Sequence, residues 1–244
     1  MRRLLLSVLI VLFFLGGLQA QRGRGLVDKN DESQSYLSLS LGPEYCLSDE
    51  QTPLLHQLSF NDNDFTLGYR TTYGNNLGYK LALSYSNFTG NDNWAKEIDR
   101  RYSYTSSVLQ LALQAEYFIK IGRRYYYKPT PNAIYFFVGA GVLRSDASLN
   151  LGGAPPRSNY IYKPISYAPV IPFGFGYQYN FNNNFLLGAE FNGRFPFSDY
   201  IDGFKPPLVI LKNGVKTVSK SNDVMGGFSI TFTYLLGYNY LRRY

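Results

Sequence analysis

Six charged residues share a spacing that could support chemistry inside a folded domain. Each stands two positions from a small or polar residue, in a stretch where large apolar residues occupy the alternate positions. The six are Glu44, Arg70, Lys80, Glu116, Glu190 and Arg194. Successive side chains of a β-strand point to opposite faces, so this spacing predicts that all six lie on the polar faces of strands. Gathered in one interior, they could form an ion or proton pathway, or they could pair and fill the space.

The elements that would position these charges are β-strands that recur from about residue 35 to the C-terminus. Residues 77–86, LGYKLALSYS, alternate Leu and Tyr with small residues and one lysine. Large residues face one way and small or charged ones the other, which is typical of a transmembrane antiparallel up-and-down β-barrel with an apolar exterior. The eight predicted strands cover about 35–46, 64–73, 77–88, 104–120, 133–143, 167–180, 185–197 and 224–238.

Strand number decides which reading of the charges is favoured. An eight-stranded barrel is so narrow that side chains fill its interior. An unpaired charge there would cost several kcal/mol, so we expect the six charges to form salt bridges that seal the lumen. Ten strands are the alternative, if residues 198–223 contribute an extra hairpin. Pro169 and Pro172 fall in the sixth strand and are expected at its rim or at a bulge, because proline donates no backbone hydrogen bond.

The N-terminus indicates export to the outer membrane. Arg2 and Arg3 precede an apolar run at 4–15 and a small-residue region that ends at Ala20, as in a secretory signal peptide over residues 1–20. Residues 21–34 are predicted to be a flexible segment and 35–244 the barrel. Long connections alternate with short ones, and outer-membrane barrels keep the short turns in the periplasm. Both termini are therefore expected there, with membrane lipid as the barrel's surroundings.

The remaining reactive residues do not form a site for catalysis, a metal or a cofactor. The single histidine, His56, lies in a predicted loop without an orienting acid, and one His with one Cys, Cys46, is too few for zinc. Asp199 and Asp202 fit a rim turn better than a calcium site. The formal charge is +7, but the basic residues are scattered and the export signal argues against nucleic acid. We expect a protein that is not an enzyme.

One connection carries a basic and aromatic patch. Residues 121–132 contain Arg123, Arg124 and Lys128 around three tyrosines. The patch could dock on a periplasmic protein, or it could be an interfacial girdle with snorkelling bases.

Several segments resemble the PorG-like outer-membrane β-barrels of Bacteroidota over about 36–236. The most specific is GAEFNGRFPFSDYIDG at 188–203, where Glu190, Arg194, Asp199, Tyr200 and Asp202 match the family pattern. RRYSYTS at 100–106 is similar to the segment that opens the family's fourth strand. The resemblance implies a component or accessory of the type IX protein secretion machinery that docks on its periplasmic ring proteins. A structural or ligand-binding barrel unrelated to secretion is the alternative, and a small solute channel is a third reading.

Overall fold

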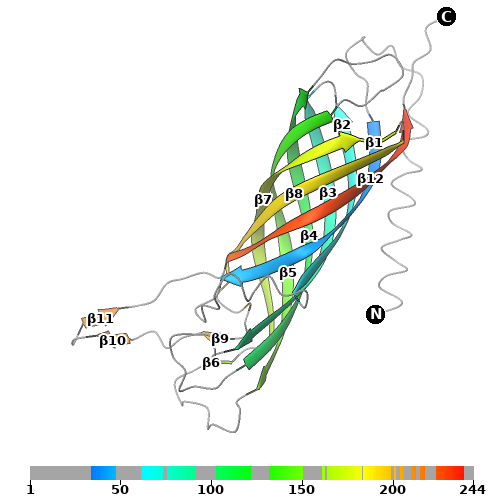
Figure 1. Cartoon of the computed structure of the whole chain (residues 1–244). Coiled ribbons are helices and arrows are strands. Elements are labelled where there is room, and N and C mark those ends of the chain that lie inside the picture. Colours follow the sequence, from blue (N-terminus) through cyan, green and yellow to red (C-terminus); the bar gives the residue numbers. More distant parts are fainter. Residues whose placement is uncertain are drawn as a thin grey trace, which may run out of the picture.

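Eight long strands close into one antiparallel barrel in the computed structural model (Figure 1). They are β1 (Gln34–Leu47), β2 (Asn63–Tyr73), β3 (Leu77–Asn91), β4 (Ser103–Ile121), β5 (Asn132–Asn150), β7 (Ile165–Asn180), β8 (Phe185–Pro196) and β12 (Val224–Tyr238). Each barrel strand pairs with the next one along the chain, and β12 closes on β1. The predicted eight-stranded up-and-down barrel is confirmed.

The structure describes residues 34–47, 62–73, 76–91, 103–121, 132–150, 161–162, 164–182, 184–198, 201, 204–205, 210–212, 215–217 and 224–238. Within these residues, no helix is long and apolar enough to cross a membrane.

The residues that could have extended the barrel form small separate sheets instead. β10 (Ile210–Lys212) pairs with β11 (Val215–Thr217), and β6 (Ile161–Tyr162) pairs with β9 (Phe204–Lys205). A hairpin therefore does form within 198–223, but the closed sheet excludes it, and the ten-stranded alternative is wrong. Strands of two or three residues are far shorter than the roughly 9–11 residues that a membrane-crossing strand needs.

The barrel exterior is an apolar belt. On β5 the outward residues are apolar from Ile134 to Val142, and the outward residues that follow are the exposed ion pair Arg144 and Asp146. Nine residues of strand span about 30 Å, or about 22–25 Å of membrane after strand tilt, close to the usual height of a lipid-facing band. Large apolar side chains remain exposed around the wall, including Leu113, Phe175 and Phe232. Such a surface is stable only against lipid.

Pro172 lies in the middle of β7 rather than at a rim or a bulge. Its partner in the β7–β8 ladder is Arg194. The β5–β7 ladder omits the pairs opposite Ile171 and Pro172, then resumes at Gly141↔Val170 in the same register. Because the register is kept, the missing N–H is accommodated without an extra residue, and the expected bulge does not form.

The lumen is layered along its axis. The inner face of β4 shows the order: Tyr104 and Val108 are apolar, Gln110, Gln114 and Glu116 are polar, and Phe118 is apolar again. We call the end with the short β2–β3 and β7–β8 connections the turn end, and the opposite end the loop end. Buried apolar side chains close the lumen at the turn end, in the groups Phe118, Ala133, Tyr135, Phe137 and Tyr36, Leu186, Leu235.

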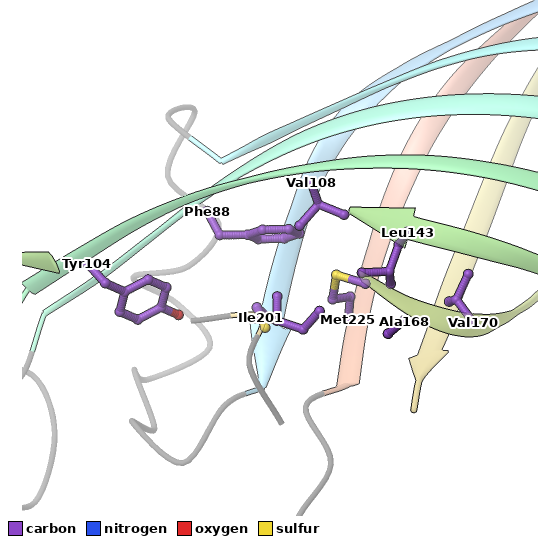
Figure 2. Packing of buried hydrophobic residues seen from close by; sticks show 9 residues of the cluster. Phe88, Tyr104, Val108, Leu143, Ala168, Val170, Ile201 and Met225 are labelled. Carbon is purple, nitrogen blue, oxygen red and sulfur yellow. The ribbon is translucent and has the colours of Figure 1, made fainter. Parts of the chain in front are cut away.

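A larger apolar cluster closes the loop end. Figure 2 shows Ile201, from the connection after β8, lying among Phe88, Val108 and Met225 of the barrel wall. The Ser106 hydroxyl donates a hydrogen bond of 2.6 Å to the Ile201 carbonyl oxygen and fixes this segment in the barrel mouth. The full cluster is Cys46, Phe88, Tyr104, Val108, Leu143, Ala168, Val170, Ile201 and Met225.

Candidate functional site

The middle layer of the lumen holds all six charges that the spacing singled out. All six residues are at most 5% exposed. They come from β1, β2, β3, β4 and β8, and strand pairing places Arg70 directly beside Lys80. They are Glu44, Arg70, Lys80, Glu116, Glu190 and Arg194, and together we call them the lumen charges.

The Arg70–Glu116 pair lies nearest the turn end. Arg70 Nη2 donates to Glu116 Oε1 at 2.9 Å, and its Nε lies 2.5 Å from Oε2, so the contact is side-on and two-pronged. Nη1 donates to Gln178 Oε1 at 3.2 Å. The guanidinium also stands over the rings of Phe118 and Tyr135, 5.3 and 5.0 Å from their centroids. Such planar pairing and stacking is what arginine does better than lysine.

Lys80 occupies the centre of the layer. Its Nζ lies 3.5 Å from Glu190 Oε2 and 5.8 Å from the ring centroid of Phe137. The Tyr135 hydroxyl donates to the same Glu190 oxygen at 2.8 Å. Glu190 therefore has one cationic and one neutral partner, and Tyr135 links this pair to the Arg70–Glu116 pair.

Arg194 holds the loop-end side of the layer. Its Nη2 donates to Asp64 Oδ1 at 2.6 Å, and its Nη1 lies 3.2 Å from Glu44 Oε2. Nη1 also donates to the Ser86 hydroxyl at 2.8 Å, and that hydroxyl donates to Asp64 Oδ1 at 2.8 Å. The Thr66 hydroxyl donates to Asp64 Oδ2 at 2.9 Å. Arg194 is thus the only guanidinium in the described lumen that bridges two acids.

Asp64 is the site residue that the sequence interpretation missed. It stands at the first position of the predicted second strand, and the sequence interpretation assigned it to neither face. Asp64 is six positions before Arg70, an even number, so the two side chains lie on the same face of the strand. That alternation would have assigned Asp64 to the lumen. With Asp64 included, four acids of this layer face three bases. A fifth buried acid, Asp62, accepts a hydrogen bond from the Thr89 hydroxyl at 2.9 Å and forms no ion pair with the three bases.

The lumen charges pair with one another and fill the middle layer of the described lumen. Every lumen charge has an oppositely charged neighbour within 4.0 Å, and apolar layers close both ends. Among the described residues, no group of three His, Cys, Asp or Glu side chains could hold a metal ion. The free thiol of Cys46 is buried in the loop-end cluster.

Several predicted features lie outside the described residues. They are the signal peptide 1–20, the segment 21–33, His56, the patch Arg123, Arg124 and Lys128, and the family-motif residues Asp199, Tyr200 and Asp202.

Lumen glycines make room for the large side chains of the charge layer. A Cβ added at Gly176 would lie 2.5 Å from Tyr135 Cζ and 2.6 Å from its hydroxyl oxygen. We expect Gly176→Ala to push the ring off Glu190 and to lower the free energy of unfolding by about 1–3 kcal/mol, the usual cost of overpacking. Urea titration in lipid vesicles would measure it.

The matched control for this substitution is Gly188→Ala on β8. There the added Cβ would meet no side-chain atom nearer than 3.7 Å, and only a backbone oxygen at 3.0 Å. Equal stability of the two variants would show that Tyr135 does not depend on the gap at Gly176.

A closed barrel with an apolar wall and a filled, ion-paired lumen defines a class: the small eight-stranded barrels of the outer-membrane fold. No family model matches the chain, and no curated protein matches it. Solved structures with similarity include Ail, the attachment invasion locus protein of Yersinia pestis, at 14% identity and TM-score 0.43 over 85% of this chain and 99% of that one.

Two further solved structures have similar values. A major outer-membrane protein of Thermus thermophilus is 13% identical with TM-score 0.45, covering 84% of this chain and 99% of that one. Neisserial surface protein A is 15% identical with TM-score 0.39, covering 83% and 97%. At these identities the likeness concerns the fold alone, and the PorG-like resemblance rests on the sequence motifs.

Proposed function

We propose that this protein is a non-enzymatic integral outer-membrane barrel that acts through its two ends and not through its lumen. The observation that carries the proposal is the filled cross-section of the lumen, in which ion pairs are stacked between two apolar layers. Ions or solutes would have to displace Arg70, Lys80 and Arg194 from buried partners to pass. Breaking a buried pair costs about 3–5 kcal/mol, so a conducting state is disfavoured at the height of each of these three basic residues along the lumen.

We further propose that the barrel is an accessory of the type IX secretion machinery, with both termini in the periplasm. The support for this proposal is the resemblance of the motif at 188–203 to the PorG-like pattern. Two of its matching residues, Glu190 and Arg194, each take part in an ion pair of the lumen, which gives them a structural role. The pattern therefore has a physical reason to persist in such barrels. The docking surface in this proposal is the turn-end connection that carries Arg123, Arg124 and Lys128.

Purified protein in planar lipid bilayers is expected to give no stable current. The reason is the filled lumen, in which Arg70, Lys80 and Arg194 are all paired. A wide-pore porin reconstituted in the same way provides the positive control. Stable unitary conductance of the wild-type protein would overturn the sealed-lumen proposal and favour the solute channel.

Deletion of the gene is expected to deplete cargo of the type IX system from the culture medium. An unchanged secretome would remove the secretion role and leave the structural or ligand-binding barrel.

The docking surface is tested separately, by pull-down with an Arg123→Glu, Arg124→Glu, Lys128→Glu variant. The matched control reverses two lysines at the loop end, Lys212→Glu and Lys216→Glu. Periplasmic partners should be lost from the first variant and retained by the second.

A further inference from the structure

A small cavity lies at the junction of the two ion-pair groups of the lumen. Lys80, Glu190 and Arg194 all border it. The other polar residues of its wall are Thr66 of β2, Ser84 of β3, Gln110 and Gln114 of β4, and Asn192 of β8. It offers about 10 Å³ to the centre of a water-sized sphere. That is roughly the smallest volume that can hold one buried water molecule.

Three amide side chains of this wall each carry a carbonyl oxygen that accepts no hydrogen bond from the described residues. These oxygens are Gln110 Oε1, Gln114 Oε1 and Asn192 Oδ1, and each belongs to a residue more than nine-tenths buried. A buried acceptor left without a donor costs about 1–3 kcal/mol, so a donor inside this cavity that reaches even two of these oxygens would be stabilising.

The group that donates to these oxygens must be small, and it must also accept a hydrogen bond from Lys80. Nζ of Lys80 lies 3.5 Å from its only carboxylate partner in the described lumen, a long contact that leaves its N–H groups able to donate elsewhere. A water molecule can donate to two of the amide oxygens and accept from the ammonium. A metal cation fits poorly, because Lys80 and Arg194 place two positive charges in the same wall.

We infer that the lumen holds a specific internal water site between Lys80 and the Gln110, Gln114 and Asn192 oxygens. This water joins the Lys80–Glu190 pair to the side of the layer held by Arg194. The lumen is then sealed but not dry, and one immobilised water is part of its hydrogen-bonded network. The apolar layers at both ends keep this water from exchanging freely with solvent.

Solid-state NMR of the full chain in lipid bilayers tests the site, with water protons as the probe. Polarisation from water is expected to reach the side-chain amides of Gln110 and Gln114 at short mixing times. Gln178 is the internal control, because it is buried in the same lumen but bonds Arg70 and does not border the cavity. Its amide is expected to show at least a several-fold weaker transfer.

Each other result contradicts the inference. No transfer to Gln110 and Gln114 would mean a dry cavity. Equal transfer to Gln178 and to Val108 of the loop-end cluster would mean a lumen hydrated throughout. Signals that vanish when sodium chloride is exchanged for choline chloride would mean a bound cation.

Substitution of Gln114 gives a second test, in which the urea midpoint is expected to change in opposite directions for a water-filled and for a dry cavity. Gln114→Met keeps the side-chain length and removes the acceptor. If water is bound, this variant loses the water transfer at Gln110 and its urea midpoint falls. In a dry cavity the same change removes an unpaired acceptor, and the midpoint would rise. Ser40→Ala is the matched control, because Ser40 bonds Thr231 elsewhere in the lumen and its loss should leave the Gln110 signal unchanged.

Discussion

Replacing Arg194 with methionine is expected to lower the free energy of unfolding by about 3–5 kcal/mol. The guanidinium lies between Glu44 and Asp64, and both carboxylates are almost completely buried. Methionine fills similar space but leaves two like charges close together without a counter-ion. Equilibrium unfolding by urea in lipid vesicles would measure the loss.

The matched control is Arg144→Met, which removes an arginine from an ion pair on the barrel's outer surface. Arg144 Nη2 lies 3.6 Å from Asp146 Oδ2, and the two side chains are 46% and 53% exposed. Exposed pairs contribute about 0–1 kcal/mol, so little change is expected. Adding Glu44→Gln and Asp64→Asn to Arg194→Met should recover much of the lost stability. Equal stability of the two single variants would show that Arg194 does not neutralise the lumen acids.

Leu113→Arg is expected to destabilise the barrel by about 2–4 kcal/mol in a bilayer, the usual cost of an arginine on the lipid face near the membrane midplane. Leu113 is 60% exposed and lies near the middle of the apolar run on β4. Its side chain points into lipid, so the guanidinium would have no polar partner at that depth. Folding yield and urea midpoint in vesicles of a fixed lipid composition would give the value.

Thr105→Arg on the same strand and face provides the control. Thr105 is exposed but lies beyond the apolar run, among polar outward residues, where the cost falls to about 0–1 kcal/mol. A large penalty at both positions would place the membrane boundary elsewhere. No penalty at Leu113 would contradict the assignment of the apolar face to the exterior.

The fold was accessible to sequence reasoning because β-periodicity is local. Alternation of two residues assigns each side chain to a face, and the sharpness of that alternation on 77–86 and 104–120 made the strands and their faces predictable. Asp64 was not assigned to the lumen because it is the first residue of the predicted strand. The residues before it were expected to form a loop, so the alternation could be followed on one side of Asp64 only. The position of Pro172 was predicted wrongly because a strand can accommodate a missing N–H where the pairing with its neighbour is interrupted. That interruption of the β5–β7 ladder is a property of the folded sheet.

The sequence by itself determined that antiparallel strands form a barrel with an apolar exterior, and that six charges face its interior. The closed sheet decided between eight strands and ten. Which charges pair was decided only by tertiary structure. Arg194 meets Asp64, 130 positions away along the chain, because closure of the sheet places β2 and β8 three strands apart around one narrow lumen, across which their side chains meet. Periodicity fixes the direction of a side chain relative to its own strand. Only the closed register fixes which side chains share a height, and therefore which charges, rings and cavities meet.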